Sequence, residues 1–405
     1  MALRPGRLRL VWLALGLTLM LGVGSAVAMF AWPHADPDQL WKDAESSLGG
    51  GRIDDAEARM RRLAALRSPT VLDWLLRGQV AMARNRTDEA IADLRQVPNN
   101  HPMAPQAWLL EGQLELRRHR TRAAEAAFLH ALKRDPELAQ ARRELIYIYG
   151  MQLRRRELCQ QFEALSKLTP ITFKQAFDWC LTRGVIWEPT EVAADLEKFL
   201  AADPDDRWSR LALAESLRRP GRLDEAEKVL SPLPSSDVDA LAIRARIALD
   251  RGDEKTTAAL LAEGSTDHPG LAFLRGRMAL ARHDTATAVR QFRIAHAADP
   301  EDRDAVFFLG NALRIVGKAD EAEPFLETAR RQDLLATLIH RAVNPTDRDD
   351  PQLPYQLGRA CEALHRYPEA RAWYNLAIGR DALDQRAQQA LFRVNAAEAS
   401  EGKTQ

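Results

Sequence analysis

The sequence predicts an all-α protein, a solenoid of stacked antiparallel helix pairs preceded by one hydrophobic helix. Three observations support this prediction. Small and aromatic residues follow a helical spacing on either side of short polar turns. The same spacing returns at intervals of about 34 residues, and an uncharged run covers residues 10–32. Stacked pairs of this kind form an elongated body that has no single central core.

The clearest helix pair lies between residues 108 and 136. Gly112 belongs to the first helix, and Ala124 and Phe128, four residues apart, share one face of the second. Gly112 and Ala124 leave room for the two backbones to approach, while Phe128 fills the space between one pair and the next. Pro136 ends the second helix, because proline has no N–H group and disfavours helix in the residue before it.

The same positions recur in phase along the chain. They are Trp74, Gly78, Ala90, Leu94 and Pro102, then Tyr149, Phe162 and Pro170, then Gly276, Ala288, Phe292, Ala295 and Pro300, and then Gly310, Ala322 and Ala329. This pattern resembles the tetratricopeptide repeat (TPR) family. The resemblance implies an α-solenoid, a superhelix of antiparallel helix pairs whose first helices line a concave groove.

The repeat pattern and its interruptions divide the chain into eight segments. They are a basic cytoplasmic segment at 1–9, a transmembrane anchor or signal peptide at 10–32, a linker at 33–39, tandem repeats at 40–332, an inserted helix and loop at 333–354, a final repeat at 355–381, a capping helix at 382–398 and a disordered tail at 399–405.

The uncharged run at 10–32 is long enough to cross a bilayer as a helix, and three arginines precede it. Trp12 and Trp32 would lie near the two membrane interfaces. The alternative is a signal peptide cleaved after the sequence AVA at 26–28. The first interpretation predicts a single-pass membrane protein with its repeats on the non-cytoplasmic side, and the second a secreted or periplasmic protein.

The two repeats between Pro136 and Pro204 depart most from the pattern. The positions that should hold small residues carry larger ones, namely Ile146, Leu158, Cys180 and Val192. Larger side chains at close-packed positions should widen the helix pairs. We therefore expect a local change in the superhelix here, and a partner site near it.

Composition and motifs argue against several classes of function. Lys and Arg number 57, and so do Asp and Glu, so the net charge is zero and the chain lacks the basic surface that nucleic-acid binding usually needs. The three cysteines form no CxxC pair, and we expect buried thiols and no disulfide scaffold. There is no HExxH, phosphate loop or GxSxG motif. We therefore predict a non-enzymatic protein without cofactor or metal.

In the family that the chain resembles, ligand peptides contact two positions of each first helix. One position lies three residues before the small residue of that helix, and the other lies one residue after it. Carried over to this chain, together with side chains nearer the helix starts, the resemblance implies the following partner-binding residues: Gln140, Arg143, Tyr147, Lys174, Phe177, Leu181, Trp208, Arg277, Phe307 and Asn311. The alternative is that the aromatic members of this set pack between neighbouring helices.

These features together predict a protein–protein interaction scaffold that binds partner proteins or extended peptides in the groove. One alternative is an envelope assembly or export component that handles a polymer such as a polysaccharide, but the irregular spacing of the aromatic residues does not favour it. Another is the regulatory subunit of an enzyme complex. No nucleic-acid partner is expected, and the membrane would be contacted through residues 10–32.

Overall fold

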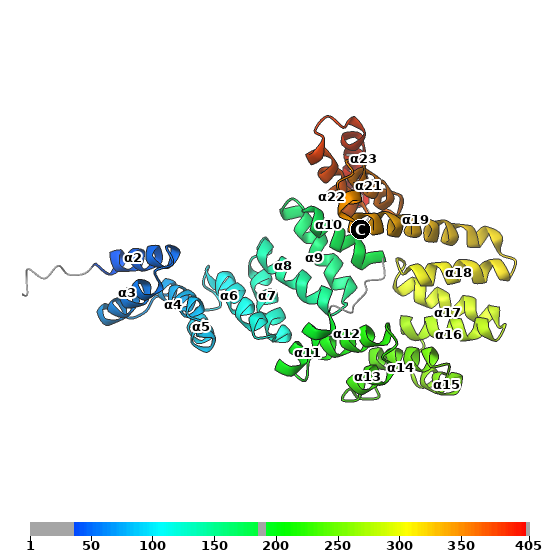
Figure 1. Cartoon of the computed structure of the whole chain (residues 1–405), viewed down its shortest axis with the longest axis horizontal. Helices are drawn as coiled ribbons and strands as arrows, with labels where there is room; N and C mark the ends of the chain where they lie inside the picture. Colours follow the sequence, from blue (N-terminus) through cyan, green and yellow to red (C-terminus); the bar gives the residue numbers. More distant parts are fainter. Residues whose placement is uncertain (1–35, 185–191, 402–405) are drawn as a thin grey trace, which may run out of the picture. The chain divides into compact units, whose positions relative to one another are not determined.

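The computed structural model describes residues 36–184 and 192–401. The predicted anchor or signal helix lies outside these residues, as does most of the predicted tail. Within the described ranges, no helix combines the length and apolar character that a bilayer crossing requires. All regular structure there is helical, in 22 helices labelled α2 to α23 (Figure 1). This result confirms the all-α prediction for the described part of the chain.

The chain forms two compact units that divide after Met103. The N-terminal unit holds α2 (Pro37–Gly49), α3 (Ile53–Leu66), α4 (Val71–Ala83) and α5 (Thr87–Leu94). These helices pack as two antiparallel pairs, α2 with α3 and α4 with α5. Helix α2 begins at Pro37, inside the predicted linker, because the Asp36 side chain caps it and proline suits a first helical position.

The C-terminal unit contains eighteen helices in the described residues. Its first part consists of α6 (Ala104–Arg117), α7 (Thr121–Arg134), α8 (Ala139–Met151), α9 (Arg155–Leu168), α10 (Phe173–Gly184), α11 (Ala193–Ala202), α12 (Arg207–Arg218), α13 (Leu223–Leu230) and α14 (Val238–Asp250). Its second part consists of α15 (Glu254–Glu263), α16 (Pro269–Ala281), α17 (Thr285–Ala298), α18 (Arg303–Ile315), α19 (Ala319–Val343), α20 (Pro345–Arg348), α21 (Leu353–Ala363), α22 (Tyr367–Arg380) and α23 (Gln385–Glu401).

The close approach predicted for the helix pairs is present. A Cβ atom placed on Gly112 would lie 2.5 Å from Cε1 of Phe128, and one placed on Gly276 would lie 2.6 Å from Cε1 of Phe292. Both phenylalanines are fully buried. The ring of the second helix therefore occupies the volume that a larger residue would need in the first helix, whereas the sequence predicts only that the two backbones approach there.

The atypical repeats between Pro136 and Pro204 differ from the expected stack in the helices that they contact. Helices α10 and α11 were expected to form one pair, but in the described residues α11 packs on α12 while α10 packs on α9, α19 and α22. One buried cluster accordingly joins side chains of α10 to those of α19, α21 and α22. In Figure 1, α10 lies beside α19 and α22, which follow it by more than a hundred residues.

A second set of long-range contacts fixes the start of α12. Asp206 caps this helix and is fully buried. Its carboxylate accepts hydrogen bonds from the Thr121 hydroxyl on α7 and, at 3.1 Å, from the Gln152 side-chain amide after α8. The α11–α14 segment is thus joined to the α7–α8 segment by buried polar contacts as well as by apolar packing.

The helix boundaries in the last part of the C-terminal unit differ from the predicted ones. Residues 333–343 were expected to form a separate inserted helix, but α19 continues without a break from Ala319 to Val343. Pro324 falls in its second turn, where few intrahelical hydrogen bonds are lost. The expected loop contains the short α20 and the first two residues of α21, and α21 and α22 then form the final pair. Helix α23 packs on α22, in the place predicted for a capping helix.

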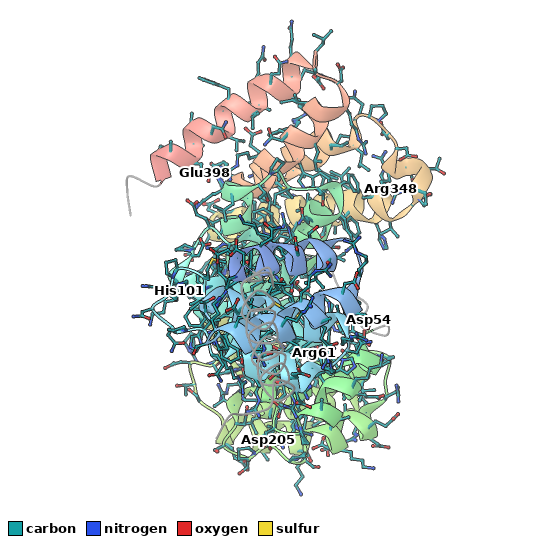
Figure 2. All side chains as sticks on the ribbon, turned by 90° about the vertical axis from the view of Figure 1, so that its left-hand side faces the viewer. Asp54, Arg61, His101, Asp205, Arg348 and Glu398 are labelled. Carbon is teal, nitrogen blue, oxygen red and sulfur yellow. The ribbon has the colours of Figure 1, made fainter. Side chains whose placement is uncertain are left out.

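Charged side chains cover the outside of the helices. Asp205 and Arg348, for example, are exposed and point away from the backbone (Figure 2). Oxygen and nitrogen ends of side chains are interspersed over this view.

Candidate functional site

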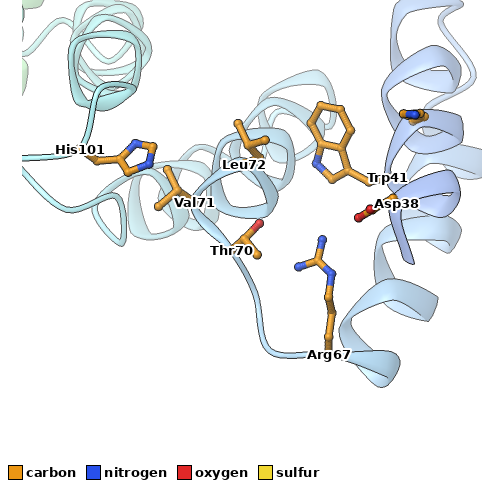
Figure 3. Close-up of a pocket in the computed structure, with 8 residues that line it drawn as sticks. Asp38, Trp41, Arg67, Thr70, Val71, Leu72 and His101 are labelled. Atoms are coloured by element: carbon orange, nitrogen blue, oxygen red, sulfur yellow. The ribbon is translucent and has the colours of Figure 1, made fainter. Parts of the chain in front are cut away.

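An open depression of about 870 Å³ lies in the N-terminal unit. Trp41 of α2 and Leu72 of α4 line it, with Arg67 below them (Figure 3). Arg67 already binds Asp73 through two hydrogen bonds, whereas the Lys42 ammonium makes no ion pair with any described residue. Asp38 also lines the depression and offsets the charge of Lys42, so the depression best fits an apolar side chain.

The first-helix face of α8 carries three of the predicted residues. The Glu144 carboxylate accepts hydrogen bonds from Gln140 at 2.8 Å and from Gln113 of α6 at 3.1 Å. Arg143 donates to the Gln140 side-chain oxygen at 3.3 Å. Gln140 and Arg143 are thus held by neighbouring side chains, while Tyr147 leaves 44% of its surface exposed.

Tyr147 also faces α11. Partial burial raises the pKa of its hydroxyl, and the nearby carboxylate of Asp195 raises it further. The hydroxyl is therefore neutral at physiological pH and can donate a hydrogen bond to a ligand.

The predicted residues of α10 have different surroundings. Lys174 is exposed and forms a 2.6 Å ion pair with Asp178. Phe177 and Leu181 are half-buried against the core that α10 shares with α19, α21 and α22. These two side chains pack inside the molecule, at positions where we predicted contact with a partner.

Trp208 also packs inside the molecule. It lies against the α11–α14 core, and two guanidinium groups stack near its ring, Arg154 at 4.9 Å and Arg207 at 4.7 Å from the ring centre. Cation–π contacts of this kind hold the ring between helices. The packing alternative therefore applies to Trp208, and contact of its exposed part with a partner stays a prediction.

The remaining predicted residues lie on α16 and α18. Arg277 is exposed, and its guanidinium carbon lies 5.9 Å from the ring centre of Phe308. Phe307 is half-buried and stacks with Arg303 at 4.6 Å. Asn311 donates to the Phe307 carbonyl oxygen at 3.0 Å, which fixes its side chain.

Arg277 differs from most arginines of the C-terminal unit because it has no carboxylate partner among the described residues. Arg314, one helical turn beyond Asn311, likewise bonds only to that amide, at 2.8 Å. Arg246 of α14 approaches Glu215 at 3.6 Å, but Arg218 and Arg219 share the same carboxylate. The face that α14, α16 and α18 present therefore has an excess of positive charge.

Glu215 is the buried acidic end of this face. Burial opposes its charge, but a hydrogen bond from Arg218 and the positive charges of Arg246 and Arg219 outweigh that effect and lower its pKa to about 2. The carboxylate is therefore ionised at neutral pH and is already compensated by arginines. A second anion would be attracted by the arginines that remain.

Family models described as tetratricopeptide repeat match residues 44–107, 75–139, 188–247 and 273–334, which together span more than half of the chain. The chain is a tetratricopeptide-repeat protein. Comparison with curated protein sequences finds no match.

The solved structures that resemble the chain at low identity include the following three. A tetratricopeptide repeat protein from Parabacteroides merdae is 17% identical and covers 68% of this chain and 98% of its own, with a TM-score of 0.29. Human IFIT1, in a dimer with PPP-AAAA, is 16% identical over 88% of this chain and 85% of its own, with a TM-score of 0.36. Yeast Tom70 is 12% identical over 95% and 94%, with a TM-score of 0.32.

The repeat register also identifies positions that were missing from the predicted set. Glu215 and Arg246 each follow the small residue of their first helix by one position, as Arg277 and Asn311 do. Applying the same rule to every repeat would have included them. Arg314 lies outside that rule, and the structure shows that it donates a hydrogen bond to Asn311.

One buried group contains potential metal ligands. The sulfur atoms of Cys180 and Cys361 and a carboxylate oxygen of Glu369 lie within 4.8 Å of one another. Arg183 approaches the Glu369 carboxylate at 3.3 Å and Arg366 at 3.9 Å. Two guanidinium groups beside the carboxylate would repel a cation, so this donor set fits a metal poorly. The absence of a metal and a cofactor stays a prediction, and so does the absence of a catalytic site.

Proposed function

We propose that this tetratricopeptide-repeat protein is an interaction scaffold that binds an extended acidic segment of a partner protein. The binding surface is the face formed by Arg246, Arg277 and Arg314 on α14, α16 and α18, with Phe273 and Phe307 beside them. The observation that carries the proposal is the exposed Arg277 guanidinium, which has no acidic partner among the described residues. Arginine pairs with carboxylates in a defined geometry, and the neighbouring rings offer rigid apolar area.

A binding measurement with a fluorescent glutamate-rich peptide tests the proposal. We expect binding by the wild-type chain that weakens as salt is added, since exposed charges are screened. The double variant Arg246→Glu, Arg277→Glu should weaken binding by at least about tenfold, because two attractive contacts become repulsive. Arg61→Glu is the matched control, an exposed arginine of α3 in the other unit.

Two results would count against this surface. Equal loss of binding in Arg61→Glu would indicate a nonspecific charge effect. Loss of binding in Arg143→Glu with no loss in the double variant would move the site to the α8 face that the sequence predicts.

Capture of partner proteins with the same variants distinguishes the alternative functions. A synthase or porin among the captured proteins would favour polymer handling, and a separate catalytic subunit would favour enzyme regulation.

The location of the scaffold is a separate proposal, based on the sequence of residues 10–32. We propose that this run directs the repeats across a membrane and then anchors them there. N-terminal sequencing of the mature protein tests it. An intact N-terminus in the membrane fraction supports an anchor, and a start at Met29 would mean a cleaved signal peptide and an exported protein.

A further inference from the structure

Two cysteines that are far apart in the sequence lie in contact inside the C-terminal unit. Cys180 of α10 and Cys361 of α21 are separated by 181 positions, and their sulfur atoms are 3.6 Å apart. Both side chains are fully buried. They lie in the cluster where α10 packs against α19, α21 and α22, so the pair spans the contact that joins the two segments of the unit.

The surroundings of the two sulfurs leave little for a metal ion to bind. The Trp373 indole N–H donates to the Cys180 sulfur at 3.1 Å, and Trp373 itself is fully buried. Glu369, the third potential ligand, already lies between the guanidinium groups of Arg183 and Arg366. A zinc site also needs a fourth ligand and two ionised thiols, and burial favours the neutral thiol.

We infer that Cys180 and Cys361 form a disulfide when the chain folds under oxidising conditions, and that this bond crosslinks α10 to α21. The sulfur atoms need to approach by only about 1.5 Å to reach bonding distance. The bond would close a loop of the intervening chain, which contains α11 to α20. Crosslinks that close long loops restrict the unfolded chain most.

The oxidant is a small-molecule or protein disulfide. A thiolate of one cysteine attacks it and displaces one thiol, and the second cysteine then attacks the mixed disulfide and displaces the other. Two protons and two electrons leave the protein, and the oxidant becomes two thiols. Because both sulfurs are inaccessible once α10 has docked, this exchange takes place during folding, before the contact closes.

Peptide mapping of the full chain tests the inference. The protein is refolded from urea with oxidised and reduced glutathione, its free thiols are alkylated in urea, and it is digested without reduction. We expect one linked pair of peptides that contains Cys180 and Cys361, and an alkylated Cys159. The oxidised protein should unfold at a higher urea concentration than the reduced protein.

Variants provide the matched controls. Cys159→Ala should keep both the linked peptides and the shift in urea midpoint, whereas Cys361→Ala should lose both. If Cys361→Ala does not fold, the peptide map of the wild-type chain still tests whether Cys180 and Cys361 are linked. The inference is overturned if both thiols are alkylated after oxidative refolding, or if Cys159 replaces either partner. Stoichiometric zinc that protects the thiols until a chelator is added would also overturn it. None of these outcomes depends on the proposed acidic partner.

Discussion

At the scale of single residues, the turn inside each helix pair requires one left-handed backbone position. Nine described turns have such a residue between their two helices, and it is glycine in only four. These residues are Gly51, Asn85, His119, Leu153, Gly221, Gly252, His283, Gly317 and His365. The first four follow one another at intervals of 34 residues. A left-handed conformation costs an L-residue about 1–2 kcal/mol, so the five non-glycine turns are held by the packing of the helices on either side.

Replacing His283 with glycine should therefore stabilise the protein. His283 is exposed, with a φ of 60°, and we expect a gain of about 0.5–1 kcal/mol in the free energy of unfolding after the greater chain entropy of glycine is subtracted. The reverse change, Gly252→Ala, should cost about 1 kcal/mol, although a Cβ there meets no atom. Urea unfolding measures both. Destabilisation by His283→Gly would contradict the conformational explanation.

At the scale of helices, α12 and α14 are joined by a buried charge cluster around Glu215. Its carboxylate lies 2.8 Å from Arg218 of the same helix and 3.6 Å from Arg246 of α14. The folded-state pKa of about 2 is lower than the 4.5 of an ordinary glutamate. Glu215 therefore contributes stability that is fully present above pH 4.5 and is lost as the pH falls towards 2.

The variant Glu215→Gln tests this contribution. The pKa difference corresponds to roughly 3 kcal/mol, of which the wild-type chain should lose about 2 kcal/mol more than the variant between pH 5 and pH 2.5, because the folded-state pKa lies below that range. Urea unfolding at several pH values provides the measurement. Glu263→Gln, at an exposed position on α15, should keep the wild-type pH profile. If Glu215→Gln keeps it too, the carboxylate is not held by the arginines.

At the scale of the whole C-terminal unit, distant repeats are joined by buried ions as well as by apolar packing. Arg183, at the end of α10, lies 2.8 Å from Glu301 and 3.3 Å from Glu369 of α22. Glu369 is almost fully buried, and desolvation raises its pKa even though Arg183 and Arg366 oppose that shift. Removal of either arginine would leave a buried carboxylate only partly compensated, which is strongly destabilising.

Arg183→Met should therefore destabilise the C-terminal unit by about 3 kcal/mol at neutral pH. The loss should shrink at low pH, because Glu369 binds a proton more readily in the folded state than in the unfolded state and becomes neutral. Adding Glu369→Leu should recover part of the stability.

Arg155→Met is the matched control for Arg183→Met. Arg155 forms an exposed 3.6 Å pair with Asp299 and should cost about 0.5 kcal/mol or less. Urea unfolding at neutral and acidic pH compares the three variants with the wild-type chain. An equal loss of stability in Arg155→Met would show that the buried network contributes no more to the free energy of unfolding than an exposed ion pair does.

Much of the candidate site could be predicted because it follows the repeat register. Arg277, Phe307 and Asn311 lie on the first helices where the family rule places them. The rule could not show that Phe177 and Leu181 pack against α19 to α22, since that contact joins residues more than 150 positions apart. It also could not show which arginines lack an acidic partner, because ion pairing depends on side chains from several helices.

By itself, the sequence determined most of the helix pairs, α10 and α11 excepted, because a period of 3.6 residues, small residues at the contacts and prolines at the ends are local properties of each repeat. It also determined that Gly112 and Gly276 stand at small positions of their first helices, whereas the contacts of these glycines with Phe128 and Phe292 are seen only in the structure. The partner of α10, the unbroken course of α19 and the contact between Cys180 and Cys361 were decided by the tertiary structure. The physical reason is that these features arise between repeats far apart in the chain, where burial of apolar and ionic groups outweighs the preference of each helix for its sequence neighbour.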